Sequence, residues 1–146
     1  QLVLGDILGL TTNINGGATT LVYGEYSGEE IKTYLYDIKS RERRAFVYNT
    51  FPNEKCVWSN QNKSVIYCGV PEQRLSGSLP DRWYKGVVSF SDKLYRVDTK
   101  TDTTVPISLS GLSEATDIKY IELSPNEDFL LFIDKKSGLA YSLRLD

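Results

Sequence analysis

Few residues in this chain could carry out chemistry, and the sequence contains no histidine. Histidine is the commonest general base and metal ligand near neutral pH, so the usual acid–base and metal chemistry has no obvious carrier. Two cysteines without histidine do not suggest a zinc site. We find no nucleophile elbow, phosphate-binding loop or EF-hand calcium loop. The sequence therefore favours a non-enzymatic protein that uses no cofactor or metal.

The two cysteines, Cys56 and Cys68, have a spacing that predicts a covalent bond. If Trp58 and Ile66 face each other across a β-hairpin, Cys56 and Cys68 are also directly opposed. Opposed residues of antiparallel strands have Cα atoms about 4.5–5.5 Å apart, which is within reach of a disulfide. The alternative is that both are small buried hydrophobic residues. We favour the disulfide, which predicts an extracytoplasmic location: periplasmic, cell-surface or secreted.

An insertion contributes the best candidate binding residues. The interval from Trp58 to Tyr95 is 37 residues, whereas the matching interval from Leu123 to Tyr141 is 18 residues. The excess falls mainly within residues 70–86, and loops of this length are usually functional or disordered. Aromatic and charged side chains are enriched at binding hot spots. The candidate binding residues are Arg74, Asp81, Arg82, Trp83, Tyr84 and Lys85.

A structural interpretation competes with this binding hypothesis. Trp83 and Tyr84 could fold back over the edge of a sheet and anchor the loop, and for Trp83 this interpretation is slightly favoured. Pro71, Gly77 and Pro80 argue against a helix in the insertion.

The elements that must position these residues recur along the chain. The segment from Trp58 to Tyr67 superposes without a gap on the segment from Leu123 to Phe132, at a constant shift of 65 residues. Tyrosine, valine, isoleucine and threonine punctuated by glycine, asparagine and aspartate favour strands throughout. We predict hairpins from strands 56–59 and 64–68, and from 120–124 and 129–133. A looser first copy has strands 6–11 and 20–24 around a turn at 13–17.

A second landmark predicts the third and fourth strands of each unit. Tyr36, Tyr95 and Tyr141 each follow a small or aliphatic residue and precede a spacer and a second aliphatic residue. After the first two copies come polar turns and fourth strands, at 44–48 and 104–109, whereas the third copy stops after its third strand. The predicted units are approximately 1–48, 49–109 and 110–146, within a single domain.

These hairpins resemble the WD40-like propeller repeats of TolB-type proteins. The turn of the third unit, Ser124-Pro125-Asn126-Glu127-Asp128, is similar to the family's Ser-Pro-Asp-Gly-Lys, and the second unit departs from it at Asn60-Gln61-Asn62. The resemblance implies an all-β fold of four-stranded antiparallel blades. It also implies a periplasmic location and action through protein contacts, with no catalytic residue carried over.

About three blades cannot close a ring, because propellers use about four to eight. The chain could be a fragment of a larger propeller, or could pair with a second copy by two-fold symmetry. Alternatively, residues Gln1–Leu4 could supply the fourth strand of the third unit. We favour a fragment or half-propeller, with a homodimer or larger assembly completing the ring.

Composition restricts the partners. The chain has 146 residues, 17 Lys+Arg and 19 Asp+Glu, and a net charge of −2, so nothing favours nucleic acid. No apolar run approaches the roughly 18 residues that span a bilayer. We predict a module that binds an unidentified protein partner or ligand through its loop face. The alternatives are an accessory propeller of a hydrolase or carbohydrate-active protein, and a structural subunit of a cell-surface assembly.

Overall fold

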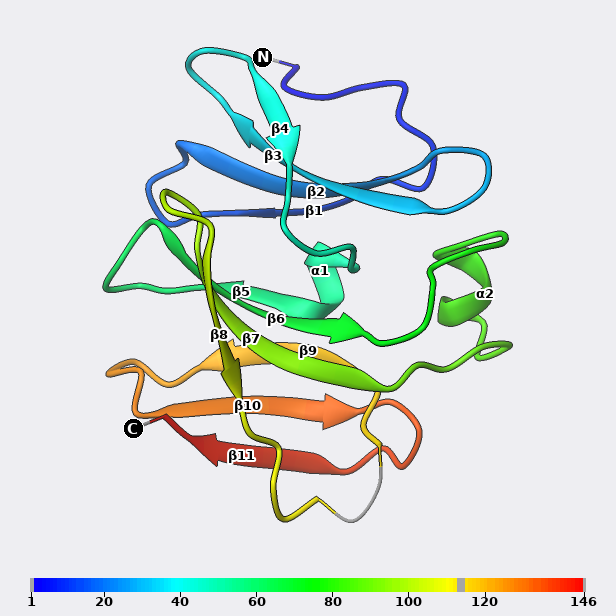
Figure 1. Ribbon diagram of the computed structural model, residues 1–146, viewed down its shortest axis with the longest axis vertical. Helices are drawn as coiled ribbons and strands as arrows, with labels where there is room; N and C mark the ends of the chain where they lie inside the picture. The colour runs from blue at the N-terminus through cyan, green and yellow to red at the C-terminus, as the bar shows by residue number, and fades with distance from the viewer. Residues whose placement is uncertain (1, 113–114, 146) are drawn as a thin grey trace.

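The computed structural model describes residues 2–112 and 115–145. Within them the chain folds into three antiparallel β-sheets, which lie one above another in Figure 1. The first sheet has the order β1 (Thr11–Ile14), β2 (Thr20–Tyr26), β3 (Ile31–Asp37) and β4 (Arg43–Ala45). The central sheet has the order β5 (Cys56–Trp58), β6 (Val65–Pro71), β7 (Asp92–Asp98) and β8 (Thr103–Ile107). The third sheet consists of β9 (Ile118–Leu123), β10 (Phe129–Asp134) and β11 (Ala140–Arg144), with β10 in the middle. The predicted all-β class, with about three blade-like sheets, is confirmed.

The central sheet is buried on both faces because its second strand is apolar at every position. Ile66 and Cys68 pack in one cluster with Val22 and Leu35 of the first sheet. Because side chains alternate along a strand, the neighbouring Tyr67 points the other way, into a cluster with residues of the third sheet. The first and third sheets therefore each bury one face of the central sheet.

A glycine allows the central and third sheets to approach closely. A Cβ atom on Gly69 would lie 3.1 Å from Cβ of Ile118, tighter than ordinary van der Waals contact. Ile118 is fully buried at the start of β9. A side chain at position 69 would require Ile118 to shift by a few tenths of an ångström, so glycine suits this close approach.

The strand connections divide between two ends of the molecule. The turns within the β1–β2, β3–β4, β5–β6 and β7–β8 hairpins lie at one end, and the insertion between β6 and β7 lies at the other (Figure 1). Helix α1 (Pro52–Lys55) contacts the innermost strands β1, β5 and β9. Side-chain bonds join the sheets here: Asn13 Nδ2 donates to the carbonyl of Cys56 at 2.8 Å.

The predicted disulfide and its register are present. Cys56 is bonded to Cys68 with Cα atoms 4.2 Å apart, and Trp58 lies opposite Ile66, as expected. The bridge thus joins β5 and β6 within one hairpin.

The first predicted strand was placed wrongly. We expected a strand at 6–11 and a turn at 13–17, but β1 runs from Thr11 to Ile14. The turn is organised by Asn15, whose Oδ1 accepts hydrogen bonds from the backbone N–H groups of Thr19 and Thr20. Several asparagines and glycines in this segment satisfy turn chemistry equally well, so the sequence did not distinguish them.

The gapless superposition of the repeats also fails by one residue. Leu123 lies opposite Leu130, whereas Trp58 lies opposite Ile66, so the third hairpin is one residue shorter. Leu131, which the shift of 65 residues matches to Ile66, is consequently exposed on the outer face of the third sheet.

The alternative in which Gln1–Leu4 completes the third unit of its own chain does not hold for the described residues. Leu2 and Val3 lie beside Tyr36 of β3 and Ile38, which follows that strand. The third sheet lies at the opposite end of the stack of sheets (Figure 1). Gln1 itself lies outside the described residues.

We predict that the double variant Cys56→Ala, Cys68→Ala loses stability. Closing a loop with a sequence separation of 12 residues lowers the entropy of the unfolded chain, which contributes about 3 kcal/mol. Denaturant unfolding should report this loss, and mass spectrometry after alkylation should find no free thiol in the wild type. Equal unfolding midpoints for the two proteins would contradict the prediction.

Candidate interaction surface at the insertion

The insertion is a folded loop with its own apolar cluster. Leu75, Leu79, Trp83 and Phe90 pack with Ile31 of the first sheet and Phe51 of the segment before α1. The prediction that the insertion contains no helix is wrong, because α2 (Asp81–Tyr84) forms a single turn. Pro80 immediately precedes that turn, a position that proline tolerates because the first N–H groups of a helix have no partner within it.

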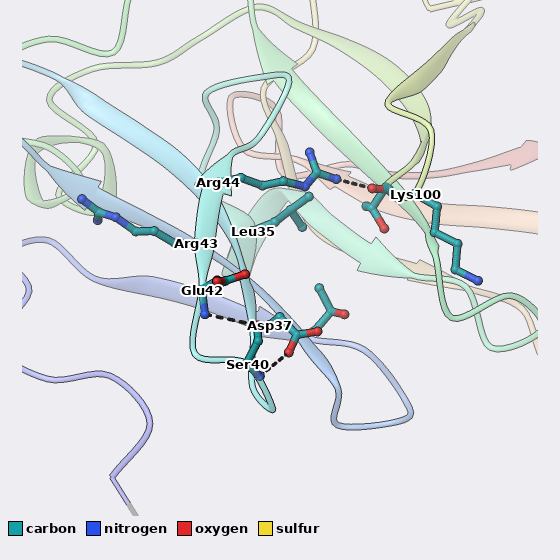
Figure 2. Close-up of a pocket in the computed structure, with 9 residues that line it drawn as sticks. Leu35, Asp37, Ser40, Glu42, Arg43, Arg44 and Lys100 are labelled. Atoms are coloured by element: carbon teal, nitrogen blue, oxygen red, sulfur yellow. Dashed lines mark hydrogen bonds between the residues drawn. The ribbon is translucent and has the colours of Figure 1, made fainter.

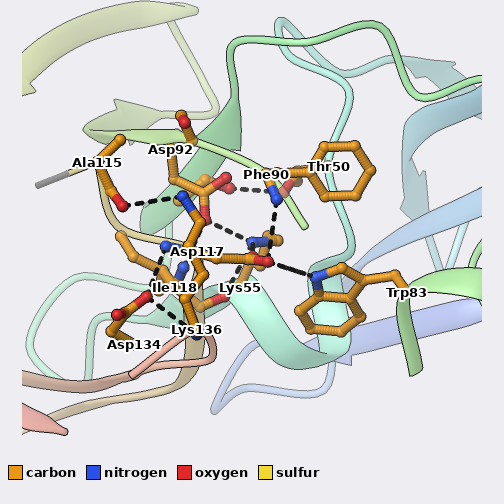
Figure 3. Close-up of polar contacts among 12 residues, drawn as sticks. Thr50, Lys55, Trp83, Phe90, Asp92, Ala115, Asp117, Ile118, Asp134 and Lys136 are labelled. Atoms are coloured by element: carbon orange, nitrogen blue, oxygen red, sulfur yellow. Dashed lines mark hydrogen bonds and ion pairs between the residues drawn. The ribbon is translucent and has the colours of Figure 1, made fainter. Parts of the chain in front are cut away.

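Trp83 anchors the insertion. Its side chain is 1% exposed, and its ring stacks on Phe51 with centroids 5.2 Å apart. The indole Nε1 donates to both carboxylate oxygens of Asp117, at 3.1 and 3.0 Å (Figure 3). Trp83 is thus placed as the structural interpretation of the sequence anticipated.

The carboxylate that holds Trp83 belongs to a buried network of charges. Lys55 Nζ, at the end of α1, contacts Asp117 Oδ1 at 2.6 Å and also bonds Asp92 Oδ2 (Figure 3). The Lys55, Asp92 and Asp117 side chains are all fully buried. The Lys55 Nζ atom also donates to the carbonyl of Ile118 at 2.9 Å and lies 4.9 Å from the Trp83 ring centroid.

Backbone groups satisfy most of the remaining acceptors. Asp92 Oδ2 accepts from the N–H of Ile118 at 2.6 Å, and Asp117 Oδ2 accepts from the N–H of Phe90 at 3.0 Å. Among the described residues, Asp92 Oδ1 is one of two buried side-chain polar atoms that have no partner.

The charges in this network do not balance, since one ammonium group faces two carboxylates. Burial raises the pKa of Asp92 to about 6, against the lowering effect of Lys55, and the nearby Asp117 carboxylate raises it further. Burial also raises the pKa of Asp134, but hydrogen bonds from Ser137 and from backbone N–H groups outweigh burial and leave that pKa below its usual value.

The network joins three parts of the chain that are remote in sequence. Lys55 and Asp117 each immediately precede the first strand of a sheet, and Asp92 begins β7. Asp134 Oδ1 accepts from the N–H of Asp117 at 2.9 Å, which ties the third sheet to the same point. Sequence analysis missed these residues, because a lone charged residue beside a strand is normally a solvated turn residue.

The other predicted binding residues lie on the outside of this anchor. Asp81, Arg82, Tyr84 and Lys85 are exposed, and Tyr84 is 47% exposed. Within the described chain, no ion pair is recorded for Arg82 or Lys85. Arg74 forms an ion pair with Glu30, the residue before β3, and its Nε atom lies 2.9 Å from Glu30 Oε2. The structure thus places three of the six candidates on the exposed side of α2 and Lys85 directly after it, buries Trp83 beneath them and pairs Arg74 with Glu30.

A hollow lies on the side of the molecule opposite the insertion, between the β3–β4 and β7–β8 turns (Figure 2). It has a volume of about 450 Å³ and a largely charged lining that includes Asp37, Glu42 and Lys100. At the edge of the hollow, Arg44 Nη1 lies 2.8 Å from Asp102 Oδ1, so this ion pair neutralises part of the positive charge of the lining. Small-molecule pockets are mostly apolar, which makes this hollow the weaker candidate.

The described residues contain no group of three or more His, Cys, Asp or Glu side chains arranged to hold a metal ion. None of the described helices has the length and hydropathy of a membrane span.

Comparison with known proteins indicates the fold only. No protein-family model and no curated protein matches this chain. The crystal structure of a "putative conserved lipoprotein" from Clostridium novyi NT is 10% identical, has a TM-score of 0.54, and covers 99% of this chain and 90% of that chain. The tricorn protease is 11% identical with a TM-score of 0.35, and the match covers 92% of this chain and 21% of that chain. The first likeness supports a shared arrangement of sheets, and the second carries no argument.

We predict that Lys55→Met strongly destabilises the protein. The substitution leaves two buried carboxylates without their cation, and breaking a buried pair in this way costs about 3–5 kcal/mol. Denaturant unfolding measures the loss, and limited proteolysis should cut the insertion first. Lys93→Met is the matched control, because Lys93 pairs with Glu72 at 2.9 Å on the exposed surface. Similar losses for the two variants would contradict a special role for the buried network.

We also predict that stability falls as the pH rises from about 4 to about 6. In this window the folded state keeps a proton on Asp92 that the unfolded chain releases, because the folded pKa of about 6 lies above the ordinary value of 3.8 for an aspartate. The slope from this group is at most about 1.4 kcal/mol per pH unit. Asp92→Asn should remove that slope in unfolding curves measured at several pH values. An unchanged pH profile in the variant would refute the assignment.

Proposed function

We propose that this chain is a non-enzymatic, extracytoplasmic module of the β-propeller type that binds a protein partner through the insertion. The observation that carries the proposal is the anchoring of Trp83 beneath an exposed group formed by Arg82, Tyr84 and Lys85. A loop held in one conformation loses little conformational entropy on binding, and arginine and tyrosine are typical anchors of interfaces. The resemblance to TolB-type repeats supports the same kind of function.

The proposed location rests on the disulfide. Disulfides persist in oxidising compartments and are rare in the reducing cytosol, so the Cys56–Cys68 bridge supports a periplasmic, cell-surface or secreted protein. The structural neighbour from Clostridium novyi is named as a lipoprotein, which agrees with that location without establishing it.

A role in a larger assembly is the second candidate, and the third sheet favours it. Phe129 and Leu131 are exposed on the outer face of β10, and the third sheet has three strands where the other two have four. A further blade or a second copy that packs on this face would bury those side chains, as the central sheet is buried by its neighbours.

We predict that a photoreactive residue in place of Lys85 captures a specific partner in cells of the native host. Combining it with Arg82→Ala and Tyr84→Ala should reduce the yield by at least about tenfold, a loss of about 1.4 kcal/mol in binding. The melting temperature should change by less than about 2 °C, because surface substitutions have small effects on stability.

The matched control places the same photoreactive residue at Lys39, in the exposed turn at the opposite end of the molecule. Capture of the same protein with equal yield from both positions would contradict a binding surface at the insertion. So would a yield that the double substitution leaves unchanged.

A further inference from the structure

The third sheet has an open edge beside an apolar hollow. Strand β11 pairs with β10 on one side, and no described strand pairs with its other side. A hollow of about 210 Å³ lies there, and its lining combines the apolar residues Leu109, Leu112, Phe132, Tyr141 and Leu143 with Ser110, Gly111 and Ser142. Unpaired backbone groups beside apolar side chains form a template for an added strand.

The central sheet shows what a fourth strand contributes at this position. Ile107 of β8 lies opposite Leu94 of β7, and both belong to the apolar cluster between the central and third sheets. Tyr141 and Leu143 of β11 pack against that same cluster. Apolar residues at alternate positions of a strand added to β11 would therefore extend the cluster.

The edge strands β4 and β8 of the first and central sheets are protected against further pairing, whereas β11 is not. Strand β4 consists of Arg43, Arg44 and Ala45, and β8 contains Pro106, which has no N–H group to donate. Arginine and proline are common devices that prevent a further strand from pairing. Strand β11, with the sequence Ala-Tyr-Ser-Leu-Arg, has a single charge at its last position and no proline.

A suitable donor segment lies at the far end of the same molecule. Leu2 is 81% exposed and Val3 is 43% exposed. Among the described residues, no backbone–backbone hydrogen bond involves Leu2, Val3 or Leu4. Leu2 and Leu4 are two positions apart, so in an extended strand they point to the same face.

We propose that Leu2–Leu4 of one copy adds to the free edge of β11 in a second copy as an antiparallel fourth strand. The fourth strands of the two complete sheets are also antiparallel to their neighbours. In this register Leu2 lies opposite Leu143, Leu4 lies opposite Tyr141, and Val3 lies opposite Ser142. The two leucines then enter the hollow beside Leu109 and Leu112.

The geometry makes this pairing intermolecular. The donor segment lies at the first sheet, and β11 lies at the other end of the stack of sheets (Figure 1). A chain therefore cannot pair its own donor segment with its own β11 without refolding. A contact between unlike surfaces is heterologous and produces rings or open chains of copies. The insertion takes no part in it, so this inference does not depend on the proposed function.

The test is site-directed crosslinking between copies. Val3→Cys in one sample and Ser142→Cys in another each add one thiol to a chain whose own cysteines are bonded to each other. Oxidation of the mixture should give a covalent dimer joined through positions 3 and 142. The control pairs Val3→Cys with Val105→Cys, an exposed position on the protected strand β8.

We expect at least about tenfold more dimer for the 3–142 pair than for the 3–105 pair, which corresponds to about 1.4 kcal/mol. Sedimentation of the wild type should show a mass that rises with concentration, and Leu2→Asp with Leu4→Asp should remain monomeric with an unchanged circular dichroism spectrum. Equal crosslinking of the two pairs, or a wild type that is monomeric at all concentrations, would overturn the proposal.

Discussion

The burial of Lys55 between two carboxylates is the constraint on which the rest of the structure depends. One ammonium group holds together the end of α1, the start of β7 and the residue that precedes β9. Taking three charges out of water is unfavourable, and their mutual attraction repays it only when the remaining hydrogen bonds are satisfied. The network therefore fixes the relative positions of the central sheet, the third sheet and the insertion, because small displacements would leave a buried charge unpaired.

Apolar packing alone would not fix these positions so closely. The two faces of the central sheet contact their neighbours through aliphatic and aromatic side chains, and such contacts tolerate sliding better than directional hydrogen bonds do. The indole of Trp83 extends the same polar network into the insertion by donating to Asp117. The conformation of the exposed surface is thereby coupled to the packing of the sheets through Trp83 and Asp117.

Local patterns in the sequence determine one part of this structure, and contacts between distant residues determine the rest. The strand pairing around Cys56 and Cys68 follows from alternation within one hairpin, so both the register and the disulfide were predictable. The position of β1 was not, because several residues there suit a turn, and the contact that Asn13 makes with Cys56 of the next sheet has no local signal in the sequence. For the same reason the buried charge network gave no signal in the sequence. Lys55 is 37 residues from Asp92 and 62 residues from Asp117 along the chain.

The two ends of the stack of sheets are unlike, and this difference has a physical consequence. At the first sheet the outer face carries Tyr23, which is buried, and the Arg43 guanidinium covers the ring of Tyr34 at 4.3 Å. At the third sheet the outer face exposes Phe129 and Leu131 without comparable cover from the described residues. A two-fold pairing through the third sheets would bury one exposed face against the other, whereas pairing through the first sheets would first require uncovering them. An assembly that pairs two copies face to face is therefore expected to use the third sheets.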